Sequence, residues 1–308
     1  MMESSNALPF STKSGHPHNL KGLTRINLDD LVSSFGWEKR PLLSWMLRLL
    51  FMGPARKFAR QMLDFDNAVG GIGLVYAARQ TQRRYVRSLR VFSPPLPAGP
   101  FLALSNHPGM VDTLALFSAL DRPDLKIIAV DRPFLKALTN TSQHLFYVTD
   151  DPADRMTLIR QVSGHLRSGG AVLTFPAGEI EPDPNVYPGA IESLDDWTDS
   201  VGIFARMVPD TAILPVLVHG VIWEKTARHS LTRLKKGREE REKLAAALQL
   251  LAQVVWNMKP LDVTVQIGRP ITIADLGSKD TKVIHQAVLA EMKRLIENPL
   301  EGFGESAI

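Results

Sequence analysis

The sequence predicts an α/β domain with a mostly parallel sheet flanked by helices, preceded by a basic amphipathic helical segment. From residue 100 onward, short apolar runs alternate with amphipathic segments, which is the pattern of strands joined by helices. The 308 residues contain 44% hydrophobic and 22% charged side chains, so the chain can bury a sizeable core. Wholesale disorder is therefore excluded, and the length fits one large domain or two ordinary ones.

The predicted strands are the short apolar runs of this region. They lie at Phe101–Leu104, Lys126–Val130, His144–Val148, Ala171–Phe175, Ile213–Val218 and Val263–Ile267. Helical patterns are expected between them, at 110–120, 133–140, 153–167 and 195–207. Further on, residues 233–243 are densely charged and residues 244–255 are apolar, which predicts a solvent-facing helix that becomes buried.

The chain is expected to divide into three regions. Residues 1–22 are polar and are predicted to form a flexible tail. Residues 23–97 are predicted to form a basic amphipathic helical region. Residues 98–308 contain the strand and helix alternation and are predicted to form the α/β domain.

Two helical segments are expected in the basic region. From Pro41 to about Met62, large apolar side chains are interspersed with Arg and Lys, and Gly53-Pro54 interrupts the pattern. This pattern fits a pair of interfacial helices, or a helical layer packed on its own core with its basic side chains outward. A second basic helix is expected at Gln80–Arg90, before the prolines of residues 94–97.

The charge is unevenly distributed along the chain. Residues 1–100 carry 14 Lys and Arg against 6 Asp and Glu, whereas the remaining residues carry 22 against 26. Residues 39–90 hold 11 of the basic side chains and 2 acidic ones. This asymmetry indicates an anionic partner, with an ordinary solvated basic face as the alternative. We expect a membrane lipid surface and not a nucleic acid, because the basic stretch contains no recognised nucleic-acid-binding module.

Several classes of protein are excluded by what the sequence lacks. It contains no cysteine, so a disulfide framework, a thiolate zinc site and a catalytic thiol are ruled out. Its eight histidines have no ligand spacing, so no metal site is expected. No signal peptide is recognised, and no apolar run approaches the ~18 residues of a spanning helix. The expected location is cytoplasmic and peripheral, on the inner face of the membrane.

The end of the first predicted strand of the domain carries a histidine and a carboxylate. His107 follows the run Phe101–Leu104 and precedes an apolar helix, so it lies at the sheet edge where open α/β sheets bind ligands. Asp112, about one turn into that helix, can reach back to the imidazole. A carboxylate on one ring nitrogen fixes the tautomer and stabilises the imidazolium that forms when the other nitrogen takes a proton. The alternative is that these residues only cap the helix.

A second strand runs into a turn at the same sheet edge. Residues 172–182 read Val-Leu-Thr-Phe-Pro-Ala-Gly-Glu-Ile-Glu-Pro, a strand followed by Pro, Gly and acidic side chains. Backbone N–H groups in such a turn could stabilise an oxyanion or hold an acceptor substrate.

Together these segments resemble the glycerolipid acyltransferase superfamily typified by 1-acylglycerol-3-phosphate acyltransferases. The Asn-His-x4-Asp signature of that family is met by Asn106, His107 and Asp112. Its third block, usually Phe-Pro-Glu-Gly-Thr-Arg, is met in part at Phe175, Pro176 and Gly178. Two apolar strand patterns of the family also match, at Ile213-Leu214-Pro215-Val216 and at Val263, Val265, Gly268, Pro270 and Ile271.

The third block departs from the family pattern in its acceptor-side residues. Ala177 and Glu179 replace the usual Glu and Thr, and Ile180 stands where the family has an Arg associated with the acceptor phosphate. We therefore expect an acceptor that is neutral or cationic near this turn, such as a zwitterionic lyso-lipid. The alternative is that another cation, Arg132 or Arg269, replaces the missing Arg.

The resemblance implies an acyltransferase of lipid metabolism that works at a membrane surface. His107, oriented by Asp112, is expected to act as general base on an acceptor hydroxyl that attacks the thioester of acyl-CoA or acyl-carrier protein. No other cofactor is implied, and oxyanion donors are expected near Pro108–Gly109 or in the turn after Phe175. The residues expected to bind substrate are Asn106, Gly109, Arg132, Phe175, Pro176, Gly178 and Glu179. The alternatives are an ester or thioester hydrolase that uses the same pair and a non-catalytic lipid-binding protein.

Overall fold

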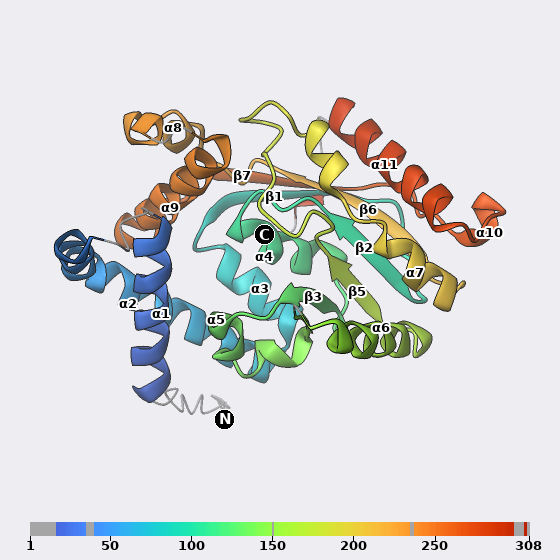
Figure 1. Cartoon of the computed structure of the whole chain (residues 1–308), viewed down its shortest axis with the longest axis horizontal. Helices are drawn as coiled ribbons and strands as arrows, with labels where there is room; N and C mark the ends of the chain where they lie inside the picture. Colours follow the sequence, from blue (N-terminus) through green and yellow to red (C-terminus); the bar gives the residue numbers. More distant parts are fainter. Residues whose placement is uncertain (1–16, 35–39, 150, 235–236, 299–304, 307–308) are drawn as a thin grey trace, which may run out of the picture.

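The computed structural model describes residues 17–34, 40–149, 151–234, 237–298 and 305–306 (Figure 1). Its helices are α1 (Pro17–Ser34), α2 (Pro41–Ile72), α3 (Leu74–Gln82), α4 (Met110–Leu120), α5 (Pro133–Lys136), α6 (Pro152–Arg167), α7 (Ser200–Met207), α8 (Glu224–Ala227), α9 (Arg238–Trp256), α10 (Ile273–Leu276) and α11 (Thr281–Glu297). Its strands are β1 (Val86–Phe92), β2 (Phe101–Ser105), β3 (Lys126–Val130), β4 (Leu145–Val148), β5 (Ala171–Thr174), β6 (Ala212–His219), β7 (Leu261–Ile267) and β8 (Glu305–Ser306). Short 3₁₀ turns lie at 141–144, 192–196 and 230–234.

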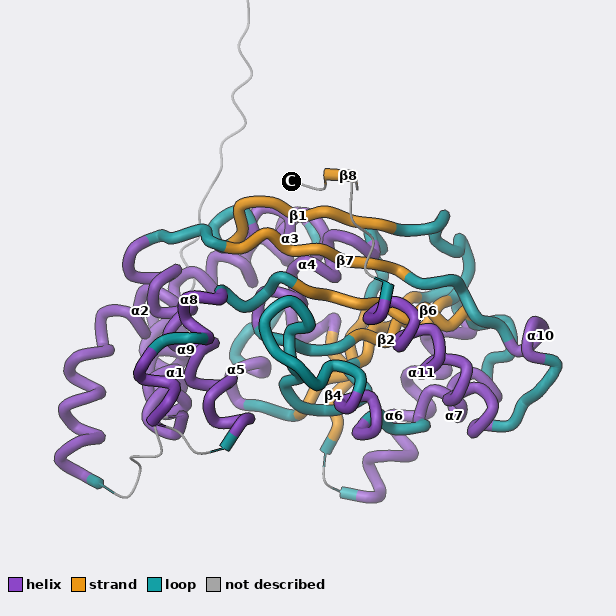
Figure 2. The backbone as a smooth tube through the Cα atoms, turned by 90° about the horizontal axis from the view of Figure 1, so that it is seen from above, coloured by secondary structure: helices purple, strands orange, loops and turns teal. Residues whose placement is uncertain are grey.

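The described strands form one sheet in the order β4-β3-β5-β2-β6-β7-β1-β8. Pairing is parallel except between β6 and β7 and between β1 and β8, so the predicted mostly parallel sheet is confirmed. Figure 2 shows β8 beside β1 at the edge of the sheet. Because β6 and β7 run in opposite directions, the carboxyl ends of β2 to β6 share one edge, whereas those of β7 and β1 lie at the other.

Helices cover both faces of the sheet. Alternate residues of β2 enter two separate apolar cores, Phe101 and Ala103 one of them and Leu102 and Leu104 the other. The first core is completed by α2, α3, α4 and α9, and the second by α6, α7 and α11. Burial on both faces explains why β2 is a continuous apolar run and not an alternating one.

The N-terminal region differs from the prediction in three places. Residues 17–22 belong to α1, whereas the remainder of the expected tail, 1–16, lies outside the described residues. The expected helix pair is one helix, α2, which continues through Pro54. The expected helix at 80–90 is wrong, because α3 ends at Gln82 and β1 pairs with β7 from Val86 onward.

Residues 86–92 form strand β1 because of contacts with β7, which the local sequence pattern cannot show. The Arg87 guanidinium forms an ion pair with Asp262 on β7, and the Ser88 hydroxyl donates to the same carboxylate at 2.6 Å. Arg90 also donates to Thr264 on β7, at 3.3 Å. These basic side chains pair with the neighbouring strand and do not form the polar face of a helix. The expected domain boundary at 97/98 therefore falls between two strands of one sheet.

The remaining elements follow the prediction closely. Each predicted strand from residue 101 onward is present within two residues of its expected ends, and α4 spans the expected 110–120. The expected helices at 133–140 and 195–207 are shorter, at 133–136 and 200–207. The charged-to-apolar segment forms α9, as predicted, whereas α11 has no predicted counterpart. None of the described helices combines the length and apolar character that a membrane span needs.

Candidate active site

The site lies at the sheet edge formed by the carboxyl ends of β2, β5 and β6. His107 is the second residue after β2 and precedes α4, which lies near the centre of Figure 1. Helix α4 begins at Met110 with Gly109 as its N-cap, so Pro108 lies just before the helix. Asp112 is consequently the third residue of α4 and lies within its first turn.

His107 and Asp112 are brought together as their spacing predicts. The Nδ1 atom of His107 lies 2.8 Å from Oδ2 of Asp112, whose side chain is completely buried. Asp112 also accepts hydrogen bonds from the backbone N–H of Gly109 at 2.9 Å and of Thr113 at 2.5 Å. Because the carboxylate only accepts, Nδ1 carries the hydrogen of the neutral ring and Nε2 is the basic nitrogen.

The imidazole is also held by an aromatic ring. Phe175, the residue after β5, stacks on His107 with 4.4 Å between ring centroids and 30° between ring planes. The His107 side chain remains 29% exposed, so the ring is held on one side and open on another. Next to Phe175, Pro176 is buried and Gly178 adopts φ of 71°, the left-handed region that favours glycine, which closes the turn.

The charges around the ring raise the pKa of His107. Burial by itself lowers that pKa, but the negative charge and hydrogen bond of Asp112, with a further contribution from Glu181, outweigh burial. The positive charge of Arg132 opposes this increase. Arg132 is exposed at the N-cap of α5, so this expected binding residue stands close enough to act on His107 electrostatically.

Glu181 is a site residue that the motifs do not include. It is one of the acidic residues in the predicted turn at 172–182, but it is buried beneath His107 and bonded to the protein. Its Oε2 accepts the His107 backbone N–H at 3.1 Å, and its Oε1 accepts the Trp197 indole N–H at 2.8 Å. Its own backbone N–H donates to the His107 carbonyl at 2.9 Å. Burial raises the pKa of Glu181 to about 7, although these hydrogen bonds lower it.

Asp183 is a second buried carboxylate that the sequence did not single out. Its side chain accepts backbone N–H groups of Asn185, Gly220, Val221 and Ile222, at 2.6 to 3.1 Å. It therefore holds the loop that follows β6 against the segment that follows β5. Alternating acidic residues after a strand end were the available signal, but the sequence did not show which of them turn inward.

Asn106 holds the main chain of β6, a role different from the substrate binding expected of it. Its side-chain amide donates to the Val218 carbonyl at 2.9 Å and accepts the Val218 N–H at 2.8 Å. The buried side chain thus extends the pairing of β2 with β6 by one step beyond the end of β2.

The main-chain donors expected near Pro108–Gly109 are already bonded. The N–H of His107 donates to Glu181 and that of Gly109 donates to Asp112, while proline has no N–H. His107 and Gly109 themselves therefore offer no free N–H group, and the expectation of oxyanion donors near these positions stays a prediction. In the other expected turn, the Gly178 N–H donates to the Phe175 carbonyl at 3.0 Å.

The remaining expected residues are divided between the two sheet edges. Glu179 is exposed on the turn after β5, beside the site. Arg269 follows β7, whose carboxyl end lies at the opposite edge, so it does not replace the missing Arg. Arg132 is the expected cation that lies on the side of His107.

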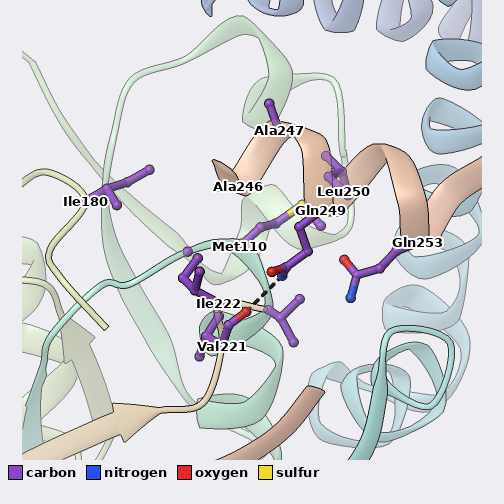
Figure 3. A pocket seen from close by; sticks show the side chains of 11 residues that line it. Met110, Ile180, Val221, Ile222, Ala246, Ala247, Gln249, Leu250 and Gln253 are labelled. Atoms are coloured by element: carbon purple, nitrogen blue, oxygen red, sulfur yellow. Dashed lines mark hydrogen bonds between the residues drawn. The ribbon is translucent and has the colours of Figure 1, made fainter. Parts of the chain in front are cut away.

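A small apolar pocket of about 160 Å³ opens beside the start of α4 (Figure 3). Its walls come from the start of α4, the turn after β5, the loop after β6 and α9. The lining residues are Gly109, Met110, Val111, Ile180, Val221, Ile222, Ala246, Ala247, Gln249, Leu250 and Gln253. The Gln249 amide donates to the Val221 carbonyl at 2.8 Å and accepts the Trp223 N–H at 2.6 Å, so this polar group is already satisfied. Ile180, which stands where the family pattern has an Arg, contributes an apolar side chain to this wall.

The fold and the His107–Asp112 geometry define an α/β domain with a candidate general base at its sheet edge. A family model described as Acyltransferase matches residues 79–219, from α3 to the end of β6. Residues 79–219 are therefore similar to acyltransferases, in agreement with the resemblance that the motifs indicate.

The solved structure of the 1-acyl-sn-glycerophosphate (LPA) acyltransferase PlsC from Thermotoga maritima is similar over 91% of this chain and 96% of that chain. Sequence identity is 16% and the TM-score is 0.44. No curated protein matches the chain significantly.

Proposed function

We propose that this protein transfers an acyl group from acyl-CoA or acyl-carrier protein to a hydroxyl group of a lyso-lipid or related acceptor. The observation that carries the proposal is the His107–Asp112 pair at the sheet edge of a domain similar to acyltransferases. The ring has a fixed tautomer, a raised pKa and an open side, as a general base for an alcohol requires.

In the proposed reaction, Nε2 of His107 takes the proton of the acceptor hydroxyl as its oxygen attacks the thioester carbonyl. The resulting tetrahedral intermediate collapses with cleavage of the carbon–sulfur bond. The imidazolium then returns its proton to the leaving thiolate, so no acyl-enzyme forms. Asp112 stabilises the imidazolium between these two proton transfers.

The residues around His107 suit different parts of the substrates. Phe175, Pro176 and Gly178 shape the turn beside the imidazole, and the apolar pocket behind Gly109 suits an uncharged part of a substrate. Exposed Glu179 and exposed Arg132 offer one negative and one positive charge near the site. We propose that they select a zwitterionic lyso-lipid, whose ammonium and phosphate groups match both charges.

The outer surface of α2 supports a position on a membrane surface. Large apolar side chains are exposed along its first half, among them Trp45 at 61% and Leu49 at 67%. Basic residues follow on the same helix, where Arg56, Lys57 and Arg60 line a shallow depression of about 370 Å³. Exposed apolar residues beside basic ones are the pattern of an interfacial helix, so we propose peripheral binding to the inner, cytoplasmic membrane face.

The proposal is tested by substituting the pair and measuring both products of the reaction. Acyl transfer and free thiol release are followed with lysophosphatidic acid, with a zwitterionic lyso-lipid and with no acceptor. We expect His107→Ala to lower kcat by about 10²- to 10⁴-fold, and Asp112→Asn to lower it less, because the imidazole remains. His229→Ala, an exposed histidine away from the site, is the matched control.

The same experiment separates the alternatives. Thiol release that does not need an acceptor indicates a hydrolase. If neither product forms, the protein is a lipid-binding protein without catalytic activity. A His107→Ala variant that keeps more than about a tenth of the wild-type kcat overturns the assignment of the base. A clear preference for lysophosphatidic acid overturns the proposed acceptor.

A further inference from the structure

We infer that Glu181 is a positioning residue for His107, which fixes the main chain of the histidine and supports its imidazolium form. The inference rests on the proposed role of His107 as general base. Glu181 lies outside the motif positions that match the family pattern, and only its place in the fold reveals its contact with the histidine.

The first argument is geometric. The hydrogen bonds between the two residues run in both directions, from the His107 N–H to Oε2 of Glu181 and from the Glu181 N–H to the His107 carbonyl. Both peptide groups of His107 are therefore tied to one residue of the neighbouring segment. With Asp112 on Nδ1 and Phe175 against the ring, the histidine is held at its main chain, its ring edge and its ring face.

The second argument is that the Glu181 carboxylate is itself fixed. Its other oxygen accepts the Trp197 indole N–H at 2.8 Å and the Ser193 hydroxyl at 3.3 Å. Glu181 is 3% exposed and Trp197 is 4% exposed, so this arrangement is shielded from water. A buried carboxylate is costly unless it is hydrogen-bonded, and both oxygens of Glu181 accept hydrogen bonds from groups near the base.

The third argument is electrostatic. The charged groups that act on His107 come from different elements: Asp112 from α4, Arg132 from the start of α5, and Glu181 from the segment after β5. The two carboxylates favour the imidazolium and Arg132 opposes it. Because the proposed reaction passes through the imidazolium, removing the Glu181 charge makes His107 a weaker base.

The test removes the charge of Glu181 while keeping the shape of its side chain. We expect Glu181→Gln to lower the pKa of His107, measured by NMR titration of the ring in the full chain. In activity assays, the acid limb of the kcat profile should move to lower pH. The plateau should fall by less than the 10²- to 10⁴-fold expected for His107→Ala, because the imidazole itself remains. Glu192→Gln, the same change at an exposed position of the same segment, should leave both measurements unchanged.

A second variant keeps the test decisive if Glu181→Gln does not fold. Trp197→Phe removes a donor that lowers the pKa of Glu181, so a smaller fraction of the glutamate is ionised and the pKa of His107 should fall in the same direction by a smaller amount. Folded variants at either position with the wild-type His107 pKa and pH profile overturn the inference. The NMR titration needs no turnover, so it remains informative if His107→Ala shows that the proposed reaction is wrong.

Discussion

At the scale of single residues, buried carboxylates position the main chain around the site. Asp112 accepts the Gly109 and Thr113 N–H groups, and Glu181 accepts that of His107. Asp183 does the same for the loop after β6. Each carboxylate satisfies donors that would otherwise be buried without a partner, which fixes irregular segments that no strand or helix holds.

The buried glutamate leads to a prediction about pH and stability. Glu181 has a folded-state pKa of about 7 against an ordinary value of 4.5, so its contribution to stability is full below 4.5 and is lost as pH rises through 7. The difference corresponds to about 3 kcal/mol. His107, whose pKa is also raised, changes stability in the same direction.

We therefore expect the free energy of unfolding to fall between about pH 4.5 and pH 7 more steeply in the wild-type protein than in Glu181→Gln. Chemical denaturation at a series of pH values measures the difference. Parallel curves for the two proteins contradict the raised pKa of this glutamate.

The sequence predicts the catalytic pair but not its environment. His107 and Asp112 are close because five residues at a strand–helix junction bring them together, so local spacing suffices. Glu181 bonds to a residue 74 positions away, and its inward orientation depends on how the segment after β5 folds beneath the end of β2. The local sequence pattern therefore predicts that Glu181 is an exposed charged residue.

At the scale of elements, α2 shows how tertiary packing overrides local signals. Pro54 removes one helical hydrogen bond and predicts a break, yet the helix runs for 32 residues. Buried residues on both sides of the proline, such as Leu47, Ala55 and Phe65, show that packing of one face supports the whole helix. In β1, pairing with β7 likewise outweighs a pattern that reads as helical.

Adjacent glycines near the end of α2 give a matched prediction. A Cβ on Gly71 meets nothing within 4 Å, whereas one on Gly70 lies 2.7 Å from Oδ1 of Asn140, whose amide is bonded to Asp66. We expect Gly71→Ala to stabilise the protein by up to about 1 kcal/mol, because alanine loses less backbone entropy on folding. Gly70→Ala should destabilise it by about 1–3 kcal/mol through overpacking. Thermal unfolding of the two variants measures both effects, and equal shifts of Tm contradict the packing seen at Asn140.

At the scale of the whole molecule, the sheet joins the N-terminal region to the rest of the chain. The expected boundary at 97/98 would separate β1 from β2 and leave β7 paired on one side only, with β6. A truncation at residue 90 would likewise remove most of β1, so membrane binding has to be tested with point substitutions. The strand and helix alternation predicted the central sheet, but the return of β1 to pair with a strand 175 residues later has no local signature.

We expect the full chain to float with anionic vesicles, and the double substitution Trp45→Ser and Leu49→Ser to reduce flotation at every salt concentration. Arg56→Glu with Arg60→Glu should reduce it mainly at low salt, because each basic side chain near an anionic surface contributes about 1 kcal/mol and is screened. Ile203→Ser on α7, also an exposed apolar position, is the control. Undiminished flotation of the α2 variants contradicts the proposed membrane face.

The hydrogen bonds of Asn106 also protect the motif from deamidation. Asparagine deamidates spontaneously when the main-chain nitrogen of the next residue attacks the side-chain amide carbon. Here that nitrogen belongs to His107 and donates to Glu181, while the Asn106 amide is held at both ends by Val218. The two groups are bonded in different directions, so the attack requires local unfolding. An aspartate at this position would have no donor for the Val218 carbonyl, so the hydrogen bonds that order the site also preserve its covalent structure.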